Sequence, residues 1–322
     1  MSERTRRLRR DTLAVALVAA LPVFPVAPSV AAAARARACD GEPATIVGTR
    51  GDDLVRATAG EDVVVARAGD DVVFALGRDD VVCGGPGDDV LRGEGGHDEL
   101  HGGRGHDVLV SGAGDDVLAG GAGADVLRGA YLELDVASYR DAPSRVSVDL
   151  SARVAGTRNG RDVLDGIVAV WGSRYDDDIE GDEGPNLLRG GAGDDTVYGA
   201  GGGDEIYGER GADVLDTGNH GFARGGRGAD RLFAGDAREE LLGGIGADAL
   251  FGGDHDDRLV PGPGDDVVGA VVARDDVVAL GREDVLDRRE LVLPLARGRA
   301  EREVDHDGAE GQVEAVGAVA AV

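Results

Sequence analysis

The sequence contains no lysine, one tryptophan, two cysteines and only 3% aromatic residues. Aspartate and glycine are abundant instead, since 44 of the 62 acidic residues are aspartate and 55 residues are glycine. Both are poor helix formers, which argues against a long helical or coiled-coil protein. A net charge of −28 repels phosphate, so we expect no nucleic-acid partner. The hydrophobic content of 42% is too high for a simple disordered chain.

Residues 1–38 have the features of an export signal. An arginine-rich stretch at 4–10 precedes an apolar run at 13–21, and Ala36-Arg37-Ala38 fits a cleavage site. Because the run is short and prolines follow it, we favour a cleaved signal peptide over a retained anchor. We therefore expect a secreted, extracellular protein with no membrane span in its mature chain. The general secretory and twin-arginine routes both stay open.

Cys39 and Cys83 are the two cysteines of the chain. In an exported protein a single pair favours a disulfide, which would tie the mature N-terminus to the body. Two unpaired thiols are the alternative. Neither cysteine has the spacing of a zinc site.

A nine-residue repeat runs through most of the chain. Residues 84–92 read GGPGDDVLR, which has the form G-G-x-G-x-D-x-U-x with U a large aliphatic residue. This register gives nine blocks over 48–128, five over 172–216 and seven over 225–287, with an eight-residue slip at 217–224. Two blocks make one coil of 18 residues, so we expect the coils to stack into parallel sheets. The eighth residue of a block should point inward, as at Leu91, Leu109, Leu118, Leu127, Val197, Leu215, Leu232, Leu250 and Leu259.

The sixth residue of the blocks forms two series of aspartates, each with an 18-residue period. Stacking would place like charges about 5 Å apart. Carboxylates at that distance repel unless a cation lies between them, and oxygen ligands without histidine or cysteine favour calcium. A solvated acidic face is the alternative. The two series in the first part of the chain are Asp53, Asp71, Asp89, Asp107 and Asp125, and Asp62, Asp80, Asp98 and Asp116.

These blocks resemble the RTX, or haemolysin-type, calcium-binding repeats over residues 48–128 and 172–287. The resemblance implies an all-β fold, a parallel β-roll, with several Ca²⁺ ions held between adjacent coils by turn carbonyls and sixth-position aspartates. Two ions are expected among Asp89, Asp107 and Asp125, and a third between Asp230 and Asp248. The full set of implied metal-site residues is Asp53, Asp62, Asp71, Asp80, Gly85, Gly87, Asp89, Asp98, Gly103, Gly105, Asp107, Asp116, Gly121, Gly123, Asp125, Asp177, Gly191, Gly193, Asp195, Asp204, Asp213, Asp230, Asp248, Asp257 and Asp266.

Some blocks depart from the pattern, and atypical end repeats often cap a solenoid. Asn186 and Glu239 replace the sixth-position aspartate, and His255 replaces a turn glycine. Residues 39–128 are interpreted as a first roll with an N-terminal cap, 129–171 as a connecting β segment, 172–287 as a second roll, and 288–322 as a cap or a disordered tail. Within the connecting segment we expect strands near 136–139 and 146–150, and Trp171 as a plug of the core.

Catalytic motifs are not found. His97-Asp98-Glu99-Leu100-His101 has two histidines four apart, but its glutamate is misplaced for a zinc protease and the segment lies in a repeat. There is no G-x-S-x-G motif. We therefore expect a non-enzymatic, calcium-dependent structural or binding module whose roll folds on binding calcium, with an unknown cell-surface or polysaccharide partner. The alternative is an adhesin or toxin fragment, or a calcium-dependent extracellular enzyme, acting through 129–171 or 288–322.

Overall fold

The computed structural model describes residues 38–130, 133–158, 160–269, 276–277 and 285–287. These residues form strands joined by turns, and none of them lies in a helix. It follows that no helix of this part of the chain has the length and apolar character to cross a membrane. Residues 1–37 of the predicted signal peptide and the whole predicted tail, 288–322, lie outside the described residues.

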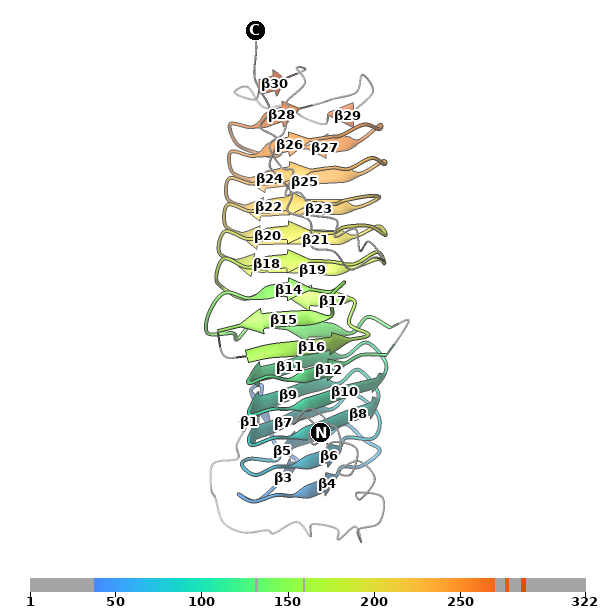
Figure 1. Ribbon diagram of the computed structural model, residues 1–322, viewed down its shortest axis with the longest axis vertical. Helices are drawn as coiled ribbons and strands as arrows, with labels where there is room; N and C mark the ends of the chain where they lie inside the picture. The colour runs from blue at the N-terminus through green and yellow to red at the C-terminus, as the bar shows by residue number, and fades with distance from the viewer. Residues whose placement is uncertain (1–37, 131–132, 159, 270–275, 278–284, 288–322) are drawn as a thin grey trace, which may run out of the picture. The chain divides into compact units, whose positions relative to one another are not determined.

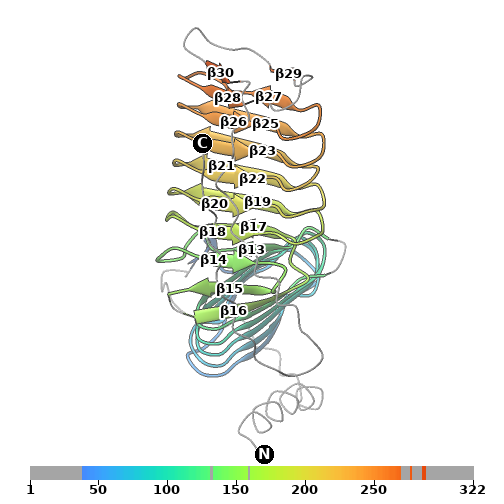
Figure 2. The same cartoon turned by 45° about the horizontal axis from the view of Figure 1, so that its top comes forward.

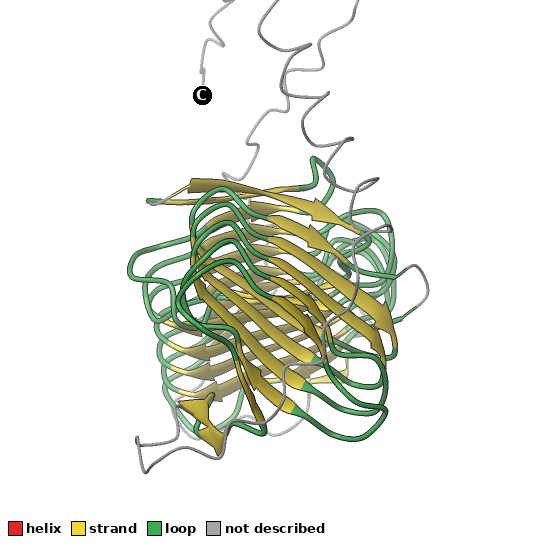
Figure 3. Ribbon diagram, turned by 90° about the horizontal axis from the view of Figure 1, so that it is seen from below, coloured by secondary structure: helices red, strands yellow, loops and turns green. Residues whose placement is uncertain are grey.

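Two sheets face each other, and the chain passes from one to the other so that a pair of strands completes one coil (Figures 1 and 3). The result is a β-solenoid of about 12 turns, which confirms the predicted all-β roll. Sheet I contains, in spatial order, β4 Leu54–Arg56, β6 Val72–Phe74, β8 Val90–Gly95, β10 Val108–Ala113, β12 Val126–Arg128, β16 Gly160–Asp165, β15 Val154–Thr157, β14 Ser147–Asp149, β18 Asp178–Glu180, β20 Thr196–Tyr198, β22 Val214–Asp216, β24 Arg231–Phe233, β26 Ala249–Phe251, β28 Val267–Gly269 and β30 Val285–Asp287.

Sheet II is parallel throughout its described strands. Its strands pair one coil apart, for example Leu100 with Leu118. In spatial order they are β3 Ile46–Val47, β5 Val63–Val65, β7 Val81–Pro86, β9 Glu99–Arg104, β11 Val117–Ala122, β13 Val136–Ser138, β17 Ala169–Trp171, β19 Leu187–Ala192, β21 Glu205–Arg210, β23 Phe222–Arg227, β25 Glu240–Ile245, β27 Arg258–Val260 and β29 Asp276–Val277.

The core is a narrow aliphatic layer between the sheets. Along a strand the seventh residue of a block is partly exposed, the eighth is buried and the ninth is partly exposed, as in β8 and β10. All nine eighth-position residues predicted to point inward are at most 1% exposed. Alternation in a strand sends only one residue of each triplet inward, so each coil depends on its neighbours to cover its leucine.

Glycines at the second and fourth block positions allow the coils to stack closely. Gly105 has φ +134°, and a Cβ added to it would lie 1.9 Å from the carbonyl oxygen of Gly87 in the preceding coil. Gly103 repeats this arrangement above Gly85. The sequence slip at 217–224 shortens one coil to 17 residues, since Glu205 pairs with Phe222, and the parallel register continues beyond it.

The connecting segment continues both sheets, as predicted, but adds a strand that we did not predict. β13 and β17 extend sheet II, whereas two strands separate β14 from β12 in sheet I. β16 and the antiparallel β15 fill the space between them (Figure 2). Thr157 at the end of β15 pairs with Gly160 at the start of β16.

The expectation that Trp171 plugs the core is wrong. Trp171 is the last residue of β17, where the burial pattern is buried, buried, partly exposed, and it lies outside the buried core cluster. The inward residue of this strand is Val170. Trp171 occupies the ninth block position, whose side chains face outward in a strand with period-two alternation.

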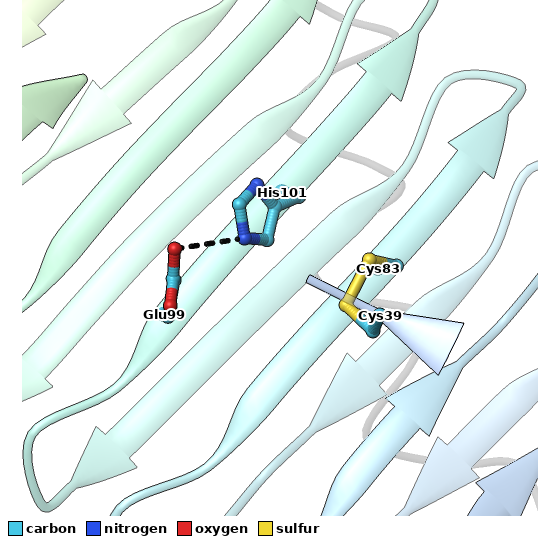
Figure 4. Close-up of a disulfide and its surroundings, with 4 residues drawn as sticks. All are labelled: Cys39, Cys83, Glu99 and His101. Atoms are coloured by element: carbon cyan, nitrogen blue, oxygen red, sulfur yellow. Dashed lines mark ion pairs between the residues drawn. A yellow bond between two sulfur atoms is a disulfide. The ribbon is translucent and has the colours of Figure 1, made fainter. Parts of the chain in front are cut away.

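A small hairpin precedes the roll. β1 Ala38–Cys39 pairs with β2 Glu42–Pro43, and Cys39 forms the predicted disulfide with Cys83 of β7, with a Cα–Cα distance of 5.8 Å (Figure 4). Cys39 is 1% exposed. The disulfide ties the start of the described chain to sheet II across 44 residues.

Replacing Gly105 with alanine tests the stacking constraint. We expect Gly105→Ala to lower the free energy of unfolding by about 2–4 kcal/mol, because a left-handed backbone and a collision with Gly87 both oppose a side chain. Gly95→Ala is the matched control, since a Cβ there meets its nearest neighbour at 3.9 Å, and its effect should stay within about 0.5 kcal/mol. Thermal and denaturant unfolding in calcium measure both, and equal losses would contradict the stacking argument.

Candidate metal centre

The sixth-position carboxylates form ladders along both edges of the roll. The backbone N–H of Asp89 donates to Asp107 Oδ1 at 2.8 Å, and that of Asp107 donates to Asp125 Oδ1 at 2.9 Å. These three aspartates are at most 1% exposed. Each carboxylate is therefore fixed by the preceding coil. The same bond is made to Asp71, Asp80, Asp89, Asp98, Asp116, Asp195, Asp204, Asp213, Asp230, Asp248, Asp257 and Asp266.

The second oxygen of most of these carboxylates is buried without a hydrogen-bond partner. A buried carboxylate oxygen of this kind is costly unless a cation or a donor reaches it. The residues concerned are Asp71, Asp80, Asp89, Asp98, Asp107, Asp116, Asp125, Asp195, Asp204, Asp213, Asp230 and Asp248, together with Oε2 of Glu239.

Backbone oxygens converge on the same places. A Cβ added to Gly102 would lie 2.5 Å from Asp107 Oδ2 and 2.6 Å from the carbonyl oxygen of Gly120 in the next coil. Gly225 has the same relation to Asp230 Oδ2 and Gly243 O. The first glycine of such a block thus lies against a carboxylate oxygen and a carbonyl oxygen, a pair called the cradle here, and any side chain at this position would collide with both.

The donor set of the cradles fits a hard cation. In the described part of the chain, no three histidine, cysteine, aspartate or glutamate side chains cluster in the manner of a metal site. A cation in a cradle would therefore take most of its ligands from backbone carbonyls and one or two from carboxylates. Calcium accepts such oxygen ligands in flexible geometry, so the residues fit calcium better than zinc.

Burial makes the ladder carboxylates weak acids. Burial, with the neighbouring charges of Asp125 and Asp89, raises the pKa of Asp107 to about 7, although the N–H of Asp89 acts in the opposite direction. Burial and the charge of Asp213 likewise raise the pKa of Asp195 to about 8. Asp80, Asp116, Asp204 and Asp213 reach about 7 by burial, and Asp89, Asp125 and Asp248 about 6.

Hydroxyl groups satisfy the carboxylate in three predicted site residues, Asp53, Asp62 and Asp177. Thr58 Oγ1 donates to Asp62 Oδ2 at 2.7 Å, and Thr49 Oγ1 makes the same contact to Asp53 Oδ2 at 3.0 Å. Although burial raises the pKa of Asp62, the hydrogen bonds from Thr58 outweigh it and the pKa is lowered. Ser173 donates to Asp177 from its hydroxyl, at 2.9 Å, and from its backbone.

Sequence reasoning missed two ladder residues in the connecting segment, Asp135 and Asp162. They accept the N–H groups of Asp116 and Asp125, each at 3.0 Å. Hydroxyls again reach the second oxygens, from Ser111 to Asp135 at 3.0 Å and from the buried Tyr139 to Asp162 at 3.1 Å. Asp162-Val163-Leu164 repeats the D-x-U reading of the blocks, which was a usable signal.

A second, exposed ladder at the fifth block position was also missed. The N–H of Asp88 donates to Asp70 Oδ1 at 2.9 Å, and the N–H of His106 donates to Asp88 Oδ1 at 2.8 Å. In this ladder each side chain accepts from the following coil, whereas the sixth-position side chains accept from the preceding one. The two ladders together connect neighbouring turns in both directions.

The glycines among the predicted site residues lie in the turns. Gly85, Gly103, Gly121 and Gly191 at the second position have φ of +98° to +119°, and Gly87, Gly105, Gly123 and Gly193 at the fourth have φ of +121° to +158°. Asn186 departs from the ladder, because its Oδ1 accepts the N–H of Asp182 in its own turn. Glu239, by contrast, reaches the N–H of His220 with its longer side chain.

The two histidines of the zinc-protease-like segment do not lie on a helix. His97 is in a turn, where its Nδ1 lies 3.0 Å from the backbone nitrogen of Asp115. His101 lies on β9 and pairs with Glu99 at 3.1 Å (Figure 4).

A parallel solenoid with buried carboxylate ladders and oxygen-lined turns defines a calcium-binding β-roll. The family model of the RTX calcium-binding nonapeptide repeat matches residues 45–73, 74–109, 102–130, 171–206, 201–219, 222–248 and 233–268. These matches cover more than half of the chain, and the protein therefore belongs to the RTX repeat family. No curated protein matches the chain. Membership assigns calcium binding and a structural or binding role.

Acidification should favour the metal-free fold. The ladder carboxylates have higher pKa values in the folded chain than the ordinary value of 3.8, so their contribution to stability is full below about pH 4 and is lost as the pH rises through about 6–8. We expect metal-free protein to show more β structure by circular dichroism at pH 5 than at pH 8. Calcium affinity should change in the opposite direction, because protons compete for the same oxygens. Loss of structure on acidification of the metal-free chain would contradict this.

Two aspartate variants distinguish turns in which the second carboxylate oxygen has no partner from turns in which a hydroxyl group binds the carboxylate, which we call hydroxyl-closed. We expect Asp107→Asn to lower the number of calcium ions bound at saturation by at least one, because the cradle loses its charged oxygen. Asp62→Asn is the matched control and should leave the number unchanged, since Thr58 already occupies that oxygen. Metal analysis after equilibrium dialysis gives both numbers. A loss of ions in Asp62→Asn alone would show that the wrong turns were chosen.

Proposed function

We propose that this protein is a secreted module whose β-roll folds when calcium binds between stacked turns, and which acts outside the cell as a calcium-stabilised structural or binding element. The observation that carries the proposal is the row of buried carboxylate oxygens without partners, several of which, as at Asp89, Asp107 and Asp230, lie beside a carbonyl oxygen of the next coil. Without a cation the row repels itself, and burial opposes its ionisation at neutral pH.

Calcium concentration then decides whether the chain folds. A cation that binds the folded chain and not the unfolded chain stabilises it by mass action. Extracellular calcium modules bind with Kd of roughly 10⁻⁴–10⁻³ M, which suits folding after export. The Cys39–Cys83 disulfide supports an extracytoplasmic location, because disulfides persist in oxidising compartments. The predicted signal peptide, 1–38, supports the same conclusion.

The ions are assigned to turns whose second oxygen has no protein donor. We place two ions among Asp89, Asp107 and Asp125, and a third between Asp230 and Asp248, where cradle and carboxylate occur together. We place none at the hydroxyl-closed carboxylates Asp53, Asp62 and Asp177, nor at Asp135 and Asp162.

The hydroxyl-closed turns suggest an organisation of two rolls. They lie at the start of 39–128, in the connecting segment 129–171, and at the start of 172–287. We propose that they cap the calcium-binding stacks, since their carboxylates need no ion.

A calcium titration monitored by far-ultraviolet circular dichroism tests the proposal. We expect oxidised, full-length mature protein at pH 7.5 to have little β structure in a chelator and to gain it at millimolar calcium. Magnesium at the same concentration is the control and should be much less effective, because it requires rigid octahedral geometry and retains its water. A β spectrum in the chelator equal to that in calcium would refute calcium-gated folding.

A further inference from the structure

The outer face of sheet II carries an alternating column of arginine and aromatic residues. Trp171, Arg189, Tyr207 and Arg224 are successive register partners on β17, β19, β21 and β23. Each of the four directly follows the buried, inward residue of its strand, so its side chain points away from the core. The column is unusual in a chain with 3% aromatic residues and a net charge of −28.

Two hollows lie along this column and share Arg189, Glu209 and Arg210. The first, of about 310 Å³, also contacts Arg140 and Trp171. The second, of about 580 Å³, is lined in addition by Tyr207, Arg224, Arg227 and Ile245. We call the two together the arginine groove. Its charged lining residues are the five arginines at 140, 189, 210, 224 and 227, and Glu209, so it is locally cationic.

The groove combines two aromatic rings, each with a guanidinium group over it, with hydrogen-bond donors. The guanidinium carbon of Arg140 lies 3.7 Å from the ring centroid of Trp171, and that of Arg189 lies 5.2 Å from the ring of Tyr207. Trp171 Nε1 and Arg189 Nε are buried and have no hydrogen-bond partner. Glu209 neutralises part of the charge, with its carboxylate 3.5 Å from Arg189, and a second carboxylate, that of Glu205, accepts a hydrogen bond from the Tyr207 hydroxyl at 3.2 Å.

We propose that the arginine groove binds an extended acidic polysaccharide, with uronate carboxylates on the arginines and sugar rings against Trp171 and Tyr207. The two aromatic residues are two coils apart, a distance of about 10 Å given the strand spacing. That distance is comparable with two sugar units of an extended chain. Planar guanidinium groups bind carboxylates through paired hydrogen bonds. The site rests on the proposed function, because it exists only where the roll is folded.

Nucleic acid is the less suitable polyanion. Its bases stack closely on successive aromatic side chains, whereas an arginine separates Trp171 from Tyr207 here. The remaining surface carries a large negative charge, which opposes a long, densely charged phosphate backbone. A polysaccharide with one carboxylate in every two sugar units has a lower charge density and suits a single cationic column.

Fluorescence of the single tryptophan, Trp171, gives a direct assay. Calcium-loaded, full-length mature protein is titrated with hyaluronan decasaccharide, and with neutral N-acetylglucosamine oligomers as a ligand control. We expect a saturable change with hyaluronan that weakens as salt is added, and a much smaller change with the neutral sugar. The variant R189A/R224A, which removes both arginines beside Tyr207, should raise Kd at least about tenfold.

The matched control is R56A/R92A. These arginines flank Phe74 in the ninth-position column of sheet I, outside the groove. Their replacement removes the same total charge as R189A/R224A. This control should leave Kd nearly unchanged, whereas an equal loss would mean that net charge alone is responsible and would overturn the site. Equal or tighter binding of an oligothymidylate would overturn the choice of polysaccharide.

The same samples separate failure of the site from failure of the proposed function. Circular dichroism in calcium establishes that each variant is folded. A folded protein with no change in Trp171 fluorescence refutes the groove alone. A protein that is folded and binds hyaluronan in chelator refutes calcium gating and leaves the groove standing.

Discussion

The stacking of buried, like-charged carboxylates is the constraint on which the rest of this structure depends. Each ladder aspartate uses one oxygen to accept a backbone N–H from the neighbouring coil, which fixes the coil spacing. The other oxygen is then buried in the turn without a hydrogen-bond partner, and burial together with the charges of neighbouring ladder aspartates raises the pKa of the carboxyl group. The chain therefore cannot reduce the repulsion between stacked carboxylates without also changing the register of the coils. A divalent cation removes the repulsion without changing the register, and this links calcium binding to the β-roll itself.

The thin core and the glycine content follow from the same arrangement. A coil of 18 residues contributes one inward aliphatic residue from each sheet, such as Leu100 and Leu109, so the apolar layer alone is narrow. Stability must come from repetition and from the turns. Glycine is required where a turn carbonyl of one coil lies against the backbone of the next, as at Gly87 and Gly105. Threonine and serine close the turns at the starts of the two repeat regions, where a hydroxyl takes the place that an ion would have.

Much of the fold could be read from the chain because the repeat is local and strict. The nine-residue period gave the two parallel sheets, the inward leucines and the carboxylate ladders, and two cysteines gave one possible pairing. Strand β15 could not be read in this way, because it pairs antiparallel within a segment that has no repeat. Trp171 was misplaced for a related reason. A single large apolar residue suggests a core, but its position in the strand triplet sends it outward.

The sequence by itself determined the period, the residue types that face inward, and the oxygen-rich chemistry that selects calcium. Those features depend on spacing within one or two blocks, which the chain carries explicitly. Only the tertiary structure decided which carboxylates are closed by Thr58, Ser173 or Tyr139, and which face a cradle. It also brought Arg140 over Trp171 and aligned that ring with Tyr207 two coils away. These contacts depend on coil register across the connecting segment, where residues far apart in the chain become neighbours through the stacking of whole coils.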